Sequence, residues 1–166
     1  MPTIMFKRVL IANRGEIALR ISRALRELGV EVCIVHGRED RLSLPVRFSD
    51  YAIPLYRNNP LDSYLDYEAV IQAAKDVGAE AILHGYGFLA ENAAFVRGCE
   101  EEGITFIGPS ADVISLLGDK IEARKAMEAA GLPVAKGSDE AIDDASVARQ
   151  LAEDIGYPVI IKAAAG

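Results

Sequence analysis

The chain has 166 residues, a formal net charge of −7 and a hydrophobic content of 51%. This length corresponds to one domain, or to one domain and part of another, and the hydrophobic content excludes gross disorder. The acidic balance argues against non-specific binding of nucleic acid, and the lack of an apolar run of about 20 residues excludes a membrane-spanning helix. Neither nucleic acid nor a membrane is an expected partner.

The N-terminus and the two cysteines predict a cytoplasmic protein. The first eight residues lack the apolar segment and the cleavage site of a signal peptide. Cys33 and Cys99 are isolated in the sequence and do not form a disulfide framework. We expect both to be reduced, buried thiols.

The stretch that organises the predicted fold lies near the N-terminus. Residues 9–11 predict a buried strand, which leads through a tight Asn13-Arg14-Gly15 turn into a helix over 16–28. Glu16 opens this helix at the end where the helix dipole favours a negative charge. A strand, turn and helix in this order are typical of an α/β sheet that binds ligands at the carboxyl ends of its strands.

The following elements continue the same alternation. Further strands are predicted at 30–35, 51–55, 81–83 and 104–107. The segments between them predict a short helix or irregular structure at 42–48, a helix over 64–77 with Ser63 as its N-cap, and a helix over 89–101. This pattern predicts an α/β fold with a doubly wound, Rossmann-like parallel sheet.

After Pro109 the pattern changes. Helices are predicted at 110–117, at 120–130 with Asp119 as the cap, and at 145–155; an acidic linker lies at 136–144 and a strand at 157–162. A domain is not expected to end directly after a buried strand. We therefore expect the sequence to be a fragment, or an ordered portion, of a longer polypeptide.

The turn at 85–90 fits the pattern G-x-G-x-x-A between a strand and a helix, where glycines let backbone approach a phosphate. The next strand ends in Gly108-Pro109 and lacks the acidic residue of a dinucleotide-binding unit. The alternative is that the glycines only make the turn. Glu91 and Asn92 then follow, either as a first-turn carboxylate and a capping amide or as polar groups that face a ligand.

Two lysines are candidates for binding phosphate. Lys120 opens a helix, where its charge opposes the dipole unless it is solvated, paired with Asp119 or placed against an anion. Lys162 leaves an apolar strand beside a small-residue loop, which would deliver its ammonium next to backbone N–H groups. The sequence contains no Walker A motif and no Cys/His cluster of the kind that binds a transition metal.

Six blocks, in order and at matching spacing, resemble biotin carboxylase. This is the ATP-grasp enzyme or subunit of acetyl-CoA, propionyl-CoA and other acyl-CoA carboxylases and of pyruvate carboxylase. The blocks are IANRGEIA at 11–18, GYGFLAEN at 85–92, FIGP at 106–109, GDK at 118–120, GS at 137–138 and IGYPVIIKA at 155–163. Together they cover essentially 5–166.

The resemblance implies two domains and one reaction. Residues 5–115 would form the Rossmann-like pre-ATP-grasp domain, and 116–166 the linker helices and the truncated beginning of the ATP-grasp lid. The reaction would carboxylate carrier-bound biotin with bicarbonate, using ATP and Mg²⁺, through carboxyphosphate. The implied partners are a biotin carboxyl carrier protein or domain, a carboxyltransferase subunit or domain, and a second copy in a homodimer.

The resemblance also implies roles for individual residues. Lys120 and Lys162 match the two lysines that contact nucleotide phosphates. Arg20 matches a position at the homodimer interface. The residues that match the turn facing biotin and bicarbonate are Tyr86, Gly87, Phe88 and Glu91. Catalytic residues and metal ligands are expected outside this fragment, so the chain alone is expected to be inactive.

The sequence departs from the family pattern at two positions. The family usually has His-Pro before Gly-Tyr-Gly; here the residues are Leu83-His84, which moves the imidazole to the other face of the strand. Where the family often has another histidine, this chain has Pro45. The alternatives are another ATP-grasp ligase, of the carbamoyl-phosphate or purine-synthesis type, and a stand-alone nucleotide-sensing or scaffold domain.

Overall fold

A computed structural model describes residues 6–138 and 140–162 and contains one five-stranded sheet. The strands are β1 (Arg8–Ile11), β2 (Glu31–His36), β3 (Tyr51–Pro54), β4 (Ala81–Leu83) and β5 (Thr105–Phe106). Their order is β3-β2-β1-β4-β5, and every neighbouring pair is parallel. The predicted α/β class and parallel sheet are confirmed.

The helices are α1 (Gly15–Glu27), α2 (Leu44–Arg47), α3 (Asp62–Leu65), α4 (Tyr67–Asp76), α5 (Ala93–Glu101), α6 (Ala111–Gly118), α7 (Lys120–Ala129) and α8 (Ala145–Ile155). Among the described helices, none is long and apolar enough to cross a membrane. The chain divides into two compact units, Met1–Ala111 and Asp112–Gly166, here called the sheet unit and the C-terminal unit.

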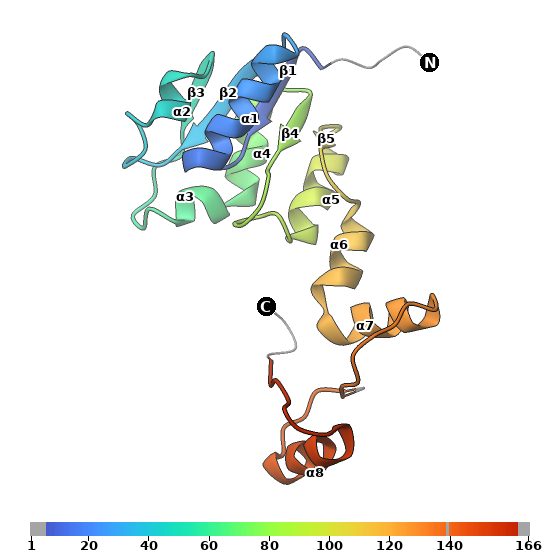
Figure 1. Cartoon of the computed structure of the whole chain (residues 1–166). Helices are drawn as coiled ribbons and strands as arrows, with labels where there is room; N and C mark the ends of the chain where they lie inside the picture. The colour runs from blue at the N-terminus through green and yellow to red at the C-terminus, as the bar shows by residue number, and fades with distance from the viewer. Residues whose placement is uncertain (1–5, 139, 163–166) are drawn as a thin grey trace. The chain divides into compact units, whose positions relative to one another are not determined.

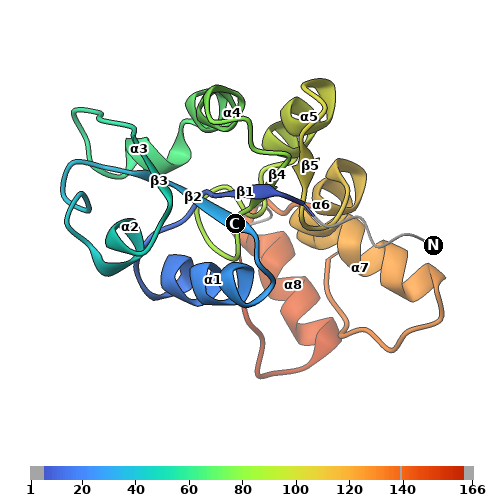
Figure 2. The ribbon, with the colours of Figure 1, turned by 90° about the horizontal axis from the view of Figure 1, so that it is seen from above.

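Helices cover both faces of the sheet in the sheet unit. Figures 1 and 2 show α1 and α2 on one face and α4 and α5 on the other. Strand residues alternate between these layers because successive side chains of a strand point to opposite faces. Val9 and Ile11 join the cluster that packs on α1, whereas Leu10 joins the cluster on α4 and α5.

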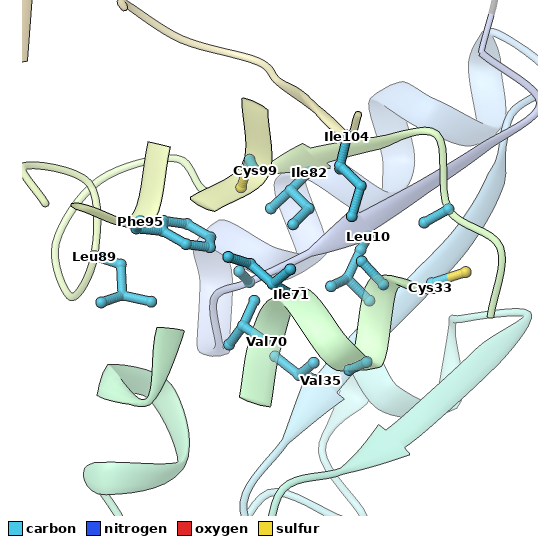
Figure 3. Packing of buried hydrophobic residues seen from close by; sticks show 14 of the residues in the cluster. Leu10, Cys33, Val35, Val70, Ile71, Ile82, Leu89, Phe95, Cys99 and Ile104 are labelled. Carbon is cyan, nitrogen blue, oxygen red and sulfur yellow. The ribbon is translucent and has the colours of Figure 1, made fainter. Parts of the chain in front are cut away.

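The cluster between the sheet and helices α4 and α5 is the larger of the two (Figure 3). Phe95 of α5 is its largest fully buried side chain and meets Phe106 edge to face, with ring centroids 5.7 Å apart. Both cysteines are buried here as free thiols, and burial raises the pKa of Cys33 to about 11 and that of Cys99 to about 12. Both thiols are therefore protonated at neutral pH.

The predicted helix over 64–77 is wrong in its first turn. The chain forms the short helix α3, leaves helical geometry at Asp66 and starts again as α4. The Asp66 side chain accepts a hydrogen bond from the N–H of Ala69 at 3.0 Å, so Asp66 is the N-cap. Ser63 instead lies inside α3, fully buried. An aspartate that can cap a helix competes with continuation of the helix through it.

The predicted helix over 89–101 begins four residues later, at Ala93. Asn92 is its N-cap and accepts from the N–H of Phe95 at 3.0 Å. Residues 89–91 belong to turns instead, since the N–H of Ala90 donates to the carbonyl of Gly87 and that of Asn92 to the carbonyl of Leu89. The turn after β4 is thus longer than the sequence pattern indicates.

In the C-terminal unit the two predicted helices at 120–130 and 145–155 are confirmed as α7 and α8. Each begins at an aspartate cap: Asp119 accepts from the N–H of Ile121 at 2.9 Å, and Asp144 from that of Ser146 at 2.7 Å. The predicted strand over 157–162 is not formed. A strand needs a neighbour for its backbone groups, and within the described part of the chain these residues pair with none.

Candidate functional site

The predicted ligand-facing turn, residues 85–88, follows β4 at the carboxyl edge of the sheet. The carboxyl ends of parallel strands meet at one edge, so the segments after β1, β2 and β4 lie together there. The strand order reverses between β1 and β4, the place where open α/β sheets commonly bind ligands. Three sets of contacts hold the turns at this edge and determine which of their polar groups remain available to a ligand.

The first set centres on Asn13, which is 3% exposed at the end of β1. Its Nδ2 donates to the carbonyl oxygens of His84 at 2.7 Å and Tyr86 at 2.8 Å. Its Oδ1 accepts from the N–H of Arg14 at 2.7 Å. The Asn13 amide therefore fixes the turn after β4 to the turn after β1, and its hydrogen-bonding groups are used within the protein.

The second set concerns Gly85, which packs against the first turn of α1. A Cβ atom on Gly85 would lie 2.7 Å from Cγ2 of Ile17 and 3.4 Å from Cδ1 of Ile21. Packing on α1 thus requires a glycine here, and α5, the helix whose N-terminus would hold a pyrophosphate in a dinucleotide-binding unit, begins only at Ala93. The geometry thus favours the interpretation of Gly85 as a packing glycine over dinucleotide binding.

Replacing Gly85 with alanine is expected to destabilise the sheet unit by about 2–4 kcal/mol, from a positive φ and from overpacking against Ile17. Gly87→Ala is the matched control, because Gly87 also has a positive φ, 76°, but nothing within 4 Å of its Cβ position. It should cost about 1 kcal/mol. Urea unfolding followed by tyrosine fluorescence measures both. Equal losses would contradict the close packing of Gly85 on α1.

The third set is a polar network that the sequence did not predict. Arg14 binds both carboxylate oxygens of Asp40, with Nη2–Oδ1 and Nε–Oδ2 distances of 2.8 Å. The hydroxyl of Tyr64 donates to Asp40 at 2.6 Å and accepts from the N–H of Gly37 at 3.0 Å. Burial alone would raise the pKa of Asp40, but the bonds from Arg14 and Tyr64 outweigh it and hold that pKa below its ordinary value.

This network supports the predicted turn through an aromatic contact. The Tyr64 ring lies against the Phe88 ring, with centroids 5.2 Å apart. Phe88 has a φ of 45°, which side-chain-bearing residues rarely adopt. Such a conformation persists only where its surroundings hold it. Tyr64 and Asp40 are separated by 24 positions, so no local sequence pattern indicates their contact.

The four predicted biotin-facing residues lie on one segment but differ in exposure. Tyr86 is 64% exposed and its hydroxyl donates to Glu16 of α1 at 2.8 Å. Gly87 is exposed and Phe88 is half-buried. Glu91 is exposed just before the α5 cap, outside the helix that it was expected to open. The structure brings Tyr86, Gly87 and Phe88 together at the sheet edge.

His84 is buried at the start of this turn, with 1% of its surface exposed. Its Nε2 accepts from the N–H of Leu89 at 3.1 Å, and its ring meets Phe95 edge to face at 6.1 Å. Burial lowers its pKa to about 4, so at pH 7 the ring is a neutral imidazole and not the imidazolium that would serve as a general acid. The neighbouring Leu83 packs in the cluster on α1, as the predicted change of face requires.

The buried His84 makes stability depend on pH. Its pKa is about 4 in the folded chain against 6.5 when unfolded, so stability is complete above 6.5 and falls as the pH drops toward 4. The expected loss between pH 7 and pH 4.5 is about 2 kcal/mol. His84→Gln should remove it, while His36 and the carboxylates remain in both proteins. A variant with the unchanged pH dependence would contradict the burial of His84.

The two predicted phosphate lysines both lie in the C-terminal unit. Lys120 is the first residue of α7 and is exposed, next to the Asp119 cap. Backbone N–H groups of Glu122 and Ile121 lower the pKa of Asp119, which keeps its carboxylate charged beside the lysine. Lys162 is exposed at the end of the irregular 157–162 segment. The small-residue loop after it, 163–166, lies outside the described residues.

Arg20 and the groove between α4 and α5 lie outside the turn 85–88. Arg20 is exposed on α1, away from the buried Ala18, Ile21, Ser22 and Leu25. An open groove of about 510 Å³ lies between α4 and α5, and none of the predicted site residues lines it. No group of three or more metal-ligating side chains occurs in 6–138 and 140–162.

Two family models match the chain in sequence. The model for the biotin carboxylase N-terminal domain matches residues 5–114. The model for the carbamoyl-phosphate synthase L chain ATP-binding domain matches residues 119–166. The matched segments thus follow one another along nearly the whole chain.

Curated relatives and solved structures resemble the chain over almost its entire length. It is 49% identical to the 2-oxoglutarate carboxylase small subunit of Hydrogenobacter thermophilus, over 98% of this chain and 34% of that one. It is 51% identical to biotin carboxylase 1 of Bacillus subtilis, over 98% and 36%. The chain therefore spans about a third of the length of these relatives.

Among solved structures, the biotin carboxylase domain dimer of the Hydrogenobacter thermophilus enzyme, in complex with MgADP, ADP and bicarbonate, matches with a TM-score of 0.92 and 49% identity. The biotin carboxylase–β,γ-ATP complex of Campylobacter jejuni matches with a TM-score of 0.92 and 46% identity. Each match covers 98% of this chain and 36% of the other. With its N-terminal two-thirds matched by the family's own domain model, this chain belongs to the biotin carboxylase family.

Proposed function

We propose that the chain is the N-terminal part of a biotin carboxylase, which carboxylates carrier-bound biotin with ATP and bicarbonate. The observation that carries this proposal is the similarity at about 50% identity to biotin carboxylases over 98% of the chain. In this reaction a bicarbonate oxygen attacks the γ-phosphorus of ATP and ADP leaves, which forms carboxyphosphate. Its carboxyl group then passes to a biotin nitrogen, and phosphate leaves.

We propose that the two units contribute different parts of the site, with a domain boundary near residue 115. Lys120 and Lys162 would contact the nucleotide phosphates and neutralise charge during phosphoryl transfer, a reaction that depends on positioning and electrostatics. Mg²⁺, when bound, would neutralise part of the phosphate charge. Its ligands would come mainly from the remainder of the enzyme, as the resemblance to the family implies.

In the sheet unit, the turn 85–88 and Glu91 would face biotin and bicarbonate. Their place at the carboxyl edge of a parallel sheet supports this role. Arg20, exposed on the outer face of α1, would lie at a homodimer interface; the similar Hydrogenobacter thermophilus domain is a dimer. A biotin carboxyl carrier and a carboxyltransferase, as separate subunits or as domains of one chain, would be the working partners.

The alternative of another ATP-grasp ligase has one point in its favour, the match of 119–166 to a carbamoyl-phosphate synthase model. Two observations weigh against it. The 49% identity to the 2-oxoglutarate carboxylase subunit extends over 162 residues, so it includes part of this segment. The chain also carries the Asn13-Arg14-Gly15-Glu16 block together with the 85–92 block. The biotin carboxylase proposal accounts for the match of 5–114 and for the identity that extends into 119–166.

A chimera tests the proposal. In it, this chain replaces the matching N-terminal third of biotin carboxylase 1 of Bacillus subtilis. We expect bicarbonate-dependent ATP hydrolysis, stimulated by free biotin, from the chimera and none from the 166-residue chain alone. A folded chimera that hydrolyses no ATP in response to bicarbonate would contradict the proposal, and activity of the chain alone would contradict the division of the site.

A further inference from the structure

The turn that follows β4 contains a buried backbone donor with an unusual partner. Leu89 is 2% exposed, so its N–H cannot be satisfied by bulk solvent and needs an acceptor within the protein. That acceptor is Nε2 of His84, at 3.1 Å, five positions earlier in the chain. The imidazole ring therefore closes the turn from its first residue to the residue after Phe88.

This contact fixes the protonation state of the ring. A backbone N–H can only donate, so Nε2 must carry a lone pair and the proton of the neutral ring lies on Nδ1. Nδ1 is buried and has no hydrogen-bond partner among the described residues. The Nδ1–H is thus a buried donor without an acceptor, which costs free energy. A histidine at this position is therefore not explained by good hydrogen bonding of both ring nitrogens. What the ring does provide is the acceptor for Leu89.

The turn is held at three points. The His84 ring closes it, the Asn13 amide binds the carbonyls of residues 84 and 86, and the Tyr64 ring packs on Phe88. Between these points lie Tyr86, exposed, and Phe88 at a positive φ. Of the three, only the contact with Leu89 uses the side chain of residue 84, the position at which the family usually has proline, whose side chain offers no acceptor.

We propose that His84 is a positioning residue, which holds the turn 85–88 in the conformation that faces biotin and bicarbonate. It does so by accepting the N–H of Leu89 at a site where its ring is also packed against Phe95. The proposal rests on the proposed function, because it concerns the same turn. It assigns His84 no contact with substrate and no proton transfer.

Two variants with side chains of similar length distinguish the effect of losing the hydrogen-bond acceptor from the effect of losing the imidazole ring. His84→Gln keeps an oxygen acceptor on a side chain of comparable reach, whereas His84→Met has only a weakly accepting sulfur. In the 166-residue chain, amide exchange of Leu89 should speed up about tenfold or more in H84M and return to nearly the original rate in H84Q. The amide of the buried Leu10 in β1 serves as the reference for global opening. Unchanged Leu89 exchange in H84M, relative to Leu10, would overturn the proposal.

The same variants in the chimera connect the turn to the reaction. We expect H84M to raise the KM for biotin about tenfold or more with little change in the KM for ATP, and H84Q to restore it. If the unsubstituted chimera lacks bicarbonate-dependent ATP hydrolysis, the proposed function fails and the positioning role with it. If that chimera is active and H84M keeps its KM for biotin, the proposed function stands and the inference about His84 is wrong.

Discussion

Replacing Phe95 with alanine is expected to destabilise the sheet unit by about 3–5 kcal/mol, the usual cost of removing a large buried aromatic side chain. Phe95 is 0% exposed and its ring contacts both Phe106 and His84. The substitution therefore removes packing from the sheet core and from the base of the turn 85–88 at the same time. The free energy of unfolding in urea measures the loss.

Tyrosine fluorescence suits this measurement, because five of the six tyrosines lie between residues 51 and 86, within the sheet unit. Phe95→Leu is the control: it keeps most of the apolar volume and should cost about 1–1.5 kcal/mol. A loss below about 1 kcal/mol for the alanine variant would show that Phe95 is not the central side chain of this core.

Replacing Lys162 or Lys120 with methionine in the chimera is expected to lower kcat for ATP hydrolysis by about 100-fold or more, the cost of removing one electrostatic stabiliser of a transition state. Methionine keeps the apolar stem and removes the charge. Both lysines are exposed, so neither substitution should affect folding.

Lys125→Met is the matched control for these variants. Lys125 lies on the same helix as Lys120 and pairs with Glu122 at 3.0 Å on the surface. The Lys125→Met variant should have a kcat within about twofold of that of the unsubstituted chimera, because exposed ion pairs contribute little. Equal effects of all three substitutions would indicate a general change in charge and contradict a specific role of Lys120 and Lys162 at the phosphates.

The sequence predicted the sheet well because its signals are local. The apolar runs at 9–11, 30–35 and 81–83 coincide with β1, β2 and β4 to within one residue. The errors arose where a side chain competes with the backbone. Asp66 ends one helix and caps the next, and the Asn92 side chain caps α5 at Ala93 while residues 89–91 form turns. Periodicity alone cannot detect such competition.

The site was only partly predictable for a related reason. The glycines of the 85–88 turn mark it in the sequence, but the contacts that hold it come from distant positions. Asn13 reaches the turn across 73 positions, and Asp40 meets the Tyr64 hydroxyl across 24. The contact of Asn13 depends on the sheet order, which places β1 beside β4. No local pattern encodes either contact.

The role of the first turn changes accordingly. Asn13-Arg14-Gly15 forms a turn between a strand and a helix at the edge where such sheets commonly bind ligands. In the structure the Asn13 amide binds the turn after β4, and Arg14 is paired with Asp40. The segment therefore organises the edge of the sheet for the neighbouring turn, and its own polar groups are occupied by the protein.

Transfer of radiolabel from bicarbonate to biotin by the chimera tests the central claim most directly, since it distinguishes a biotin carboxylase from any other ATP-grasp ligase. We predict labelled carboxybiotin that forms only when ATP and Mg²⁺ are present, and none with the 166-residue chain alone. Bicarbonate-dependent ATP hydrolysis by the chimera without any label on biotin would contradict the assignment.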